Sequence, residues 1–262
     1  MSMRIRLTAA PALAAALLMA LGTAQGSELP GAEPPGRSDP TQRAILSSDG
    51  FLSHHPDLRY RMQGSRAFED GFFNDALAHF KRAARHADKP SQAMIGEMYF
   101  TGNGVEQDRA LGYAWMDLAA ERAYPAFLAL REHYWAQLSE AERSRAIEVG
   151  QDVYAEYEDA AAQPRLEREL RRGRRGTTGS RVGSVGNLVI ELPDGPGGVP
   201  MQVRGDQFYD RRYWEPTEYW AWQDEVWGAP LRGRVEVLPL RQSDDDTRSG
   251  DDRREAGDGS PR

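Results

Sequence analysis

The chain contains no cysteine, and only two of its 262 residues, Lys81 and Lys89, are lysines. Without thiols the protein has no disulfides, no thiolate zinc ligands and no cysteine nucleophile, so its stability must come from packing. A lipid anchor of the kind that is attached to a cysteine after a signal sequence is excluded as well. Arginine supplies almost all of the basic charge, which we attribute to a GC-rich coding bias rather than to a binding function.

The common motifs of catalysis are missing too. The sequence has no G-x-S-x-G, no S-x-x-K and no H-E-x-x-H, and no two of its five histidines are four residues apart. His54 and His55 fall in a segment that we expect to be a solvated loop. The net charge of −7 argues against a nucleic-acid partner. We therefore expect no catalysis, no metal site and no cofactor.

One apolar run stands near the N-terminus. Two arginines precede residues 7–21, and small residues follow, with Ala24 and Gly26 as candidate cleavage positions. This is the layout of a secretory signal, and the run is short for a bilayer-spanning helix, which needs about 20 residues. We expect an exported, periplasmic protein with no stable membrane span once the signal is removed; a single anchoring helix is the alternative.

The rest of the chain divides by composition and periodicity. Proline, glycine and serine are frequent before residue 50, helical periodicity follows, and the last residues are charged. We expect, in chain order, a signal peptide (1–26), a flexible linker (27–57), a helical repeat domain (58–160), an arginine-rich linker (161–181), a small α+β unit (182–240) and a disordered tail (241–262).

An internal repeat organises the helical part. The alanine pairs Ala83-Ala84 and Ala119-Ala120 are 36 residues apart, and so are Phe80 and Met116. A fixed offset of this size is typical of a helix-turn-helix unit. Small residues on one helix face let the partner helix approach closely, and stacked units bury a face that one unit alone leaves exposed.

The stretch from Gly102 to Asp108 raises the question of a phosphate-binding loop. Such a loop follows a strand and carries Lys and then Ser or Thr after its last glycine. Here a helical pattern precedes Gly102, and Val105 follows Gly104. We interpret the stretch as a turn in which Gly102 ends one helix and Asp108 caps the next.

These residues resemble the Sel-one-like repeat family, which is related to the tetratricopeptide repeats. The resemblance covers about 100 residues and is complete over one unit, from Ile95-Gly96 to Ala119-Ala120. The positions that define the repeat are Gly71, Ala76, Ala83, Ala84, Gly96, Tyr99, Gly102, Gly104, Asp108, Trp115, Ala119 and Ala120.

The resemblance implies a mainly α fold, a short α-solenoid of stacked antiparallel helix pairs. It also implies an interaction scaffold that binds an envelope protein or peptide; an envelope hydrolase or peptidoglycan-associated factor is the alternative. By analogy with tetratricopeptide units, the groove that holds the partner would be lined by Arg61, Ser65, Glu69, Gln92 and Glu97. The partner's identity and the oligomeric state stay open.

The segment 126–159 departs from the family pattern and is interpreted as a degenerate or capping unit. Ser139 and Glu142 form a capping-box pattern at a helix start. The side chains expected to seal the end of the stack are Ile147, Val149, Val153, Tyr154 and Tyr157.

Two C-terminal stretches carry their own patterns. Residues 165–181 contain seven arginines and two glutamates; we favour a solvated helix end running into a linker over an anion-binding patch. Residues 182–240 predict a hairpin around a glycine-rich turn, a helix from Pro216 to Trp227, and a strand at 235–240. The aromatic residues of 208–227 are expected to form a core, with a glycan or peptide platform as the alternative.

Overall fold

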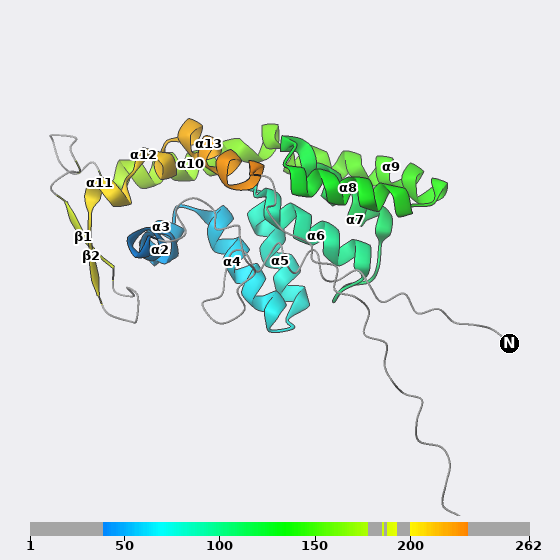
Figure 1. Ribbon diagram of the computed structural model, residues 1–262, viewed down its shortest axis with the longest axis horizontal. Helices are drawn as coiled ribbons and strands as arrows, with labels where there is room; N and C mark the ends of the chain where they lie inside the picture. The colour runs from blue at the N-terminus through cyan, green and yellow to red at the C-terminus, as the bar shows by residue number, and fades with distance from the viewer. Residues whose placement is uncertain (1–38, 178–184, 186–187, 193–199, 230–262) are drawn as a thin grey trace, which may run out of the picture. The chain divides into compact units, whose positions relative to one another are not determined.

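The computed structural model describes residues 39–177, 185, 188–192 and 200–229. This part of the chain is mainly helical and contains a small antiparallel sheet of two strands, as predicted (Figure 1). The expected signal peptide, the strand at 235–240 and the tail from residue 241 lie outside the described residues. Among the described helices, none has the length and apolar character needed to cross a bilayer.

The central part consists of helices joined by short turns. Helix α4 packs on α5, α6 on α7, and α7 on both α8 and α9. Their bounds are α4 (Pro56–Glu69), α5 (Phe73–Ala84), α6 (Lys89–Thr101), α7 (Arg109–Ala119) with a turn of 3-10 helix η1 (Ala120–Arg122), α8 (Pro125–Gln137) and α9 (Glu140–Tyr157).

Local sequence signals fix where these helices begin and end. The Asp88 and Asp108 carboxylates accept the backbone N–H groups of Ser91 and Leu111 at 3.0 Å, which caps α6 and α7. Gly102 ends α6 with a left-handed φ of 74°, a conformation that glycine adopts without strain. The capping box at the start of α9 is present as well. The predictions for Gly102, Asp108 and Ser139 are thus confirmed.

Small residues let the paired helices approach closely. A Cβ atom on Gly112 would stand 2.5 Å from the backbone nitrogen of Phe100, so no larger residue fits where α7 crosses α6. Gly96 faces the backbone of Met116 in the same way. The alanines expected in the contact, Ala76, Ala83, Ala84, Ala119 and Ala120, are buried, as is Trp115.

The segment expected to be a linker is folded from residue 40 onward. Helix α2 (Pro40–Ser47) is capped by Asp39, and α3 (Asp49–Leu52) is capped by Ser48. Ile45 is 2% exposed and Phe51 is fully buried. The linker prediction was wrong for residues 40–57, because Ile45 and Phe51 are buried in a hydrophobic core.

That core is completed by the C-terminal elements. The predicted hairpin is present as strands β1 (Val189–Leu192) and β2 (Met201–Arg204), paired with Ile190 opposite Val203. Helices α11 (Gly205–Phe208), α12 (Arg211–Trp214) and α13 (Pro216–Gly228) follow, and α13 confirms the helix predicted from Pro216. Phe208, Tyr213, Trp214 and Tyr219 are buried, so these rings form a core rather than an open platform.

We call α2, α3, β1, β2, α11 and α12 the composite unit, because residues from both ends of the described chain share one hydrophobic cluster. Phe51 packs edge-on against Phe208, Tyr213 and Trp214. His55 is fully buried, with its two ring nitrogens 2.8 Å from the carbonyl oxygens of Phe51 and Tyr213. Burial lowers the pKa of His55 to about 4. The expectation of a solvated loop at His55 was therefore wrong.

Helix α10 (Asp159–Thr177) replaces much of the expected arginine-rich linker. Leu166 and Leu170 are fully buried and form a cluster with Tyr219 of α13, which explains why this stretch is helical. In α9, Val153 is buried as predicted, whereas Ile147 is 64% exposed and seals nothing within the described residues.

Candidate functional site

The five residues predicted to line a partner groove do not share one open surface. Arg61, Gln92 and Glu97 are buried, Ser65 is half-buried, and Glu69 is exposed. The prediction placed all five away from the packing contacts, and for the three buried residues it was wrong. Each of these three side chains interacts with a residue outside its own helix.

Arg61 lies in a polar cluster between α4 and α13. Its guanidinium forms an ion pair of 2.9 Å with Asp88 and lies 5.7 Å from the ring centroid of Trp227. Asp57 accepts a hydrogen bond from the hydroxyl of Tyr219. Burial raises the pKa of both Asp57 and Asp88, against the opposing effect of Arg61. This cluster joins α4 and the start of α6 to α13, the last described helix.

Gln92 belongs to a network around the buried ammonium group of Lys89. The ammonium group contacts Gln92 Oε1 at 3.2 Å, Glu121 at 2.5 Å and Asp159 at 3.1 Å. Gln92 in turn donates to the carbonyl of Tyr157 at 3.0 Å. These contacts satisfy the Lys89 charge inside the protein and connect α6 with η1, α9 and α10.

Glu97 links α6 to α8. Its carboxylate accepts a hydrogen bond from the hydroxyl of Tyr134, whose ring stacks on Phe100 with centroids 3.8 Å apart. Burial raises the pKa of Glu97 to about 7. Glu97 is therefore a titrating group inside a helix contact and not an exposed groove residue.

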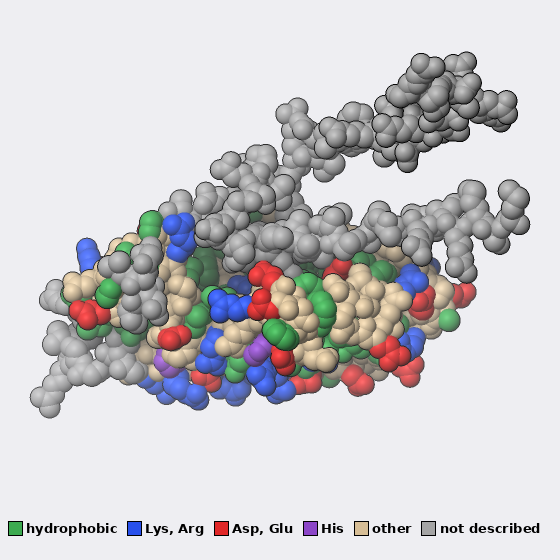
Figure 2. Space-filling model, turned by 90° about the horizontal axis from the view of Figure 1, so that it is seen from below, with side chains coloured by type: hydrophobic (Ala, Val, Ile, Leu, Met, Phe, Trp, Pro, Cys, Tyr) green, Lys and Arg blue, Asp and Glu red, His purple; other side chains and the backbone are tan. Residues whose placement is uncertain are grey.

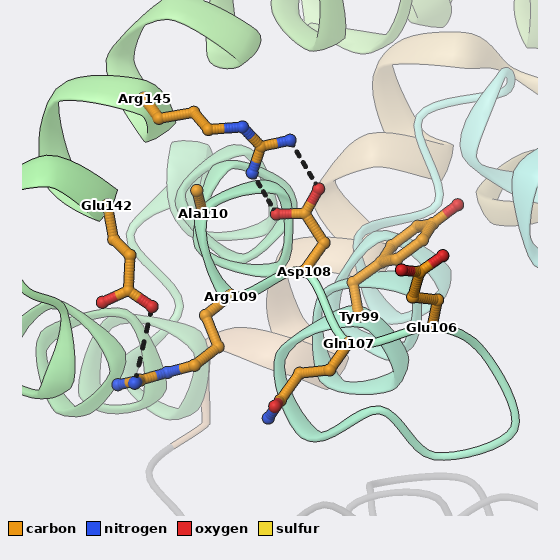
Figure 3. Close-up of a pocket in the computed structure, with 8 residues that line it drawn as sticks. All are labelled: Tyr99, Glu106, Gln107, Asp108, Arg109, Ala110, Glu142 and Arg145. Atoms are coloured by element: carbon orange, nitrogen blue, oxygen red, sulfur yellow. Dashed lines mark hydrogen bonds and ion pairs between the residues drawn. The ribbon is translucent and has the colours of Figure 1, made fainter.

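The surface that does offer space lies beside the turn between α6 and α7. It is an open hollow of about 490 Å³. Figure 3 shows its walls, which come from the end of α6, the turn, the start of α7 and the start of α9. The residues lining it are Tyr99, Glu106, Gln107, Asp108, Arg109, Ala110, Glu142 and Arg145.

Charged side chains of both signs form ion pairs between the walls of this hollow. Arg145 makes two hydrogen bonds to Asp108, one of them 2.7 Å long, and lies opposite it in Figure 3. This arginine lowers the pKa of Asp108. Arg109 pairs with Glu142 at 3.5 Å. The two ion pairs bridge α7 and α9, and they leave a polar wall on which charged and amide groups of a ligand can exchange hydrogen bonds.

Two further lining groups face solvent. Glu106 is exposed and forms no ion pair within the part of the chain that the structure describes. The hydroxyl of Tyr99 accepts a hydrogen bond of 3.1 Å from Lys81. Among the described residues, no group of three or more His, Asp or Glu side chains is placed to hold a metal ion. The arrangement is suited to polar recognition of a partner.

Sequence reasoning found Asp108 as a helix cap and missed its partner. Asp108 and Arg145 are 37 residues apart, close to the repeat offset of 36 between Phe80 and Met116. At the offset of 36 itself, however, Asp108 falls on Ser144, so the offset alone would not have identified Arg145 as its partner.

Comparison with family models, with curated proteins and with solved structures finds no match for this chain.

Proposed function

We propose that the chain is an exported, Sel-one-like helical-repeat scaffold that binds a protein or peptide segment in the cell envelope. In this proposal α4 to α9 form a short α-solenoid, and the hollow beside Asp108 takes part of the partner. The proposal assigns no catalysis to the chain.

One observation supports the solenoid: side chains in contact between helices that are two apart in chain order, such as α6 and α8 or α7 and α9, recur at a separation of 37 residues. These pairs are Glu97–Tyr134, Asp108–Arg145, Asp117–Tyr154 and Arg122–Asp159. In a stack of equal units, a residue lies beside its equivalent in the next unit, so contacts recur at the length of one unit. A constant separation supports such a stack from α6 to α9.

The preceding helices support the same arrangement. Gly64 of α4 faces the ring of Phe80, and Gly96 of α6 faces the backbone of Met116. Phe80 and Met116 are the two residues that the sequence offset of 36 relates. A glycine of the first helix thus meets the equivalent position of the second helix in both pairs.

The hollow supports binding because its chemistry is polar and its walls are braced. A peptide segment presents N–H, C=O and charged groups, which fit a surface that carries Arg145, Glu142 and Glu106. Helices α7 and α9 are already packed against each other, so binding there costs little ordering of the protein.

Site-specific photocrosslinking tests this function. A photoreactive amino acid replaces Glu106 in the hollow or, as a control, exposed Asp206 on α11, and the cells are irradiated before the envelope fraction is analysed. We expect a discrete crosslinked species from position 106, its loss in a chain that also carries Arg145→Glu, and no such species from position 206. Equal patterns from both positions, or crosslinks unaffected by Arg145→Glu, would contradict a binding role for the hollow.

A further inference from the structure

A second surface, separate from the hollow, is built from arginines on α4, α5 and α10. Helix α10 turns Leu166 and Leu170 inward, which leaves its arginines on the outer side. The side chains of Arg171 and Arg172 are 54% and 70% exposed. Arg168 is exposed and has no ion pair among the described residues.

Contacts between the helices make this surface continuous. Helix α10 packs against α4, and Arg165 donates a hydrogen bond of 3.2 Å to the carbonyl of Arg85 at the end of α5. Arg82 stands one helical turn before Arg85. Arg165 of α10 and Arg85 at the end of α5 therefore lie side by side.

Tyr60 extends the surface onto α4. The guanidinium carbons of Arg59 and Arg82 lie 4.7 and 5.6 Å from the centroid of the Tyr60 ring, and His79 stacks on the same ring at 6.1 Å. Within the described residues neither Arg59 nor Arg82 forms an ion pair. Of these two cations on one aromatic ring, Arg82 is exposed to solvent and Arg59 is half-buried.

We define the basic ridge as Arg59, Arg82, Arg85, Arg165, Arg168, Arg171 and Arg172. Three of these are paired with carboxylates, Arg85 with Glu156, Arg171 with Glu167 and Arg172 with Glu169. Among the described residues, the other four have no acidic partner, in a protein whose net charge is −7. Figure 2 shows Lys and Arg side chains gathered along one edge of the face it presents, with Asp and Glu more frequent toward the other end.

We propose that the basic ridge binds the protein to the surface of a membrane that contains anionic phospholipids. The guanidinium group matches the phosphodiester of a lipid headgroup through paired hydrogen bonds. The ridge is spread over three helices and lines neither the hollow beside Asp108 nor the smaller one beside Gly104. An open array of this kind fits an extended anionic surface better than a single ion held in a pocket.

The size of the effect follows from the number of charges. Each basic residue near an anionic membrane strengthens binding roughly five-fold at physiological ionic strength, and salt weakens it. Removing two unpaired arginines should therefore weaken binding about thirty-fold. Moderate affinity and strong salt dependence are the signature of this surface.

The test is flotation of the mature full-length chain with vesicles of phosphatidylcholine alone or with phosphatidylglycerol added. The variant Arg82→Gln with Arg168→Gln lowers the charge of the ridge; the matched control, Arg131→Gln with Arg211→Gln, removes the same charge elsewhere. We expect the chain and the control to float only with the anionic vesicles, and the ridge variant to bind about thirty-fold more weakly. Circular dichroism checks that all three chains are folded.

Several outcomes would overturn the proposal. Equal losses in the ridge variant and the control would show a response to net charge alone. Equal binding to neutral vesicles, or no binding to anionic ones, would exclude the lipid surface. Displacement from vesicles by millimolar inorganic phosphate would indicate a single ion site, and binding to heparin without binding to vesicles would indicate a soluble polyanion as the ligand.

Discussion

The helices α4 to α9 and the composite unit are held together by contacts of different range along the chain. Several polar contacts between α6 and α9 join residues 37 positions apart, as in Glu97–Tyr134. In the composite unit Gln42 of α2 contacts Tyr213 of α12 across 171 positions, and His55, just before α4, contacts the same residue across 158. The first region can form from neighbouring segments, whereas the second requires both ends of the described chain.

This difference explains what each region offers. Where each helix contacts only its neighbours, an exposed residue can be replaced without disturbing the rest of the fold. Such a region suits a binding surface such as the hollow beside Asp108. The composite unit places its aromatic residues in one buried cluster and exposes little of them. Under the proposed function, partner recognition belongs to the helices α4 to α9, and the composite unit has a stabilising role.

The largest expected effect comes from breaking the composite unit. Trp214 is 1% exposed and packs against Phe51 and His55, so Trp214→Ala should lower the free energy of unfolding by about 3–5 kcal/mol. Trp135 of α8 is only half-buried, and Trp135→Ala should lower the free energy of unfolding by less. Urea denaturation followed by circular dichroism measures both. Equal losses would mean that the two regions are not distinct in their packing.

A smaller loss is expected where α7 crosses α6. The methyl group of Gly112→Ala would overlap the backbone of Phe100, and the resulting displacement should destabilise the protein by about 1–3 kcal/mol. Gly150 of α9 is the matched control, because a Cβ there meets only Ala114 at 3.8 Å. Gly150→Ala should stabilise by about 0.5–1 kcal/mol through helix propensity. Similar denaturation midpoints for Gly112→Ala and Gly150→Ala would contradict the close approach of α7 to α6.

The contact between α6 and α8 should respond to pH. Because the pKa of Glu97 is raised from 4.5 to about 7, the folded protein keeps a proton that the unfolded chain loses between these values. Stability should therefore fall as pH rises through this window, by up to about 3 kcal/mol. Glu97→Gln should be more stable than the natural chain at pH 8 and lose that part of the pH dependence. Denaturation curves at pH 5 and 8 measure this, with Glu106→Gln as an exposed control.

If Glu97→Gln showed the same pH dependence as the natural chain, the buried carboxylate would not be the group responsible. Such a result would also weaken the interpretation that α8 docks on α6 through Tyr134.

The smallest effect on stability is expected at the hollow. The side chain of Arg145 is 52% exposed, so its ion pair with Asp108 should contribute at most about 1 kcal/mol. Arg145→Ala should leave the thermal midpoint nearly unchanged and still reduce photocrosslinking from position 106. A large drop in the midpoint would make this pair a structural contact rather than part of a binding surface.

The sequence predicted the ends of several of the helices between α4 and α9 well because the signals are local. Asp108 and Ser139 cap helices, and Gly102 ends one, through contacts within a few residues. Helices α2 and α3 also have local caps, Asp39 and Ser48, but their apolar residues Ile45 and Phe51 are buried through partners near the far end of the described chain. From the sequence alone, short apolar stretches between polar residues resemble a linker, because the sequence does not show the core in which they are buried.

The candidate site was harder to predict for a related reason. Arg61 and Glu97 were assigned to an open groove because their own helices do not predict their burial. Their burial depends on Trp227 and Tyr134, which belong to other helices. The hollow likewise needs Arg145, whose side chain approaches Asp108 only once α9 packs on α7.

The stacking of units one repeat apart can be tested directly, because the chain has no cysteine of its own. Cysteines replace Asp117 and Tyr154, which lie 37 residues apart and are joined by a hydrogen bond of 2.9 Å, and a short bismaleimide is added. The control pair replaces Asp117 and Ile147, which stands two helical turns away along α9. We predict rapid intramolecular crosslinking of 117 with 154 and little of 117 with 147. Equal crosslinking of both pairs, or faster reaction of the control, would contradict the stack.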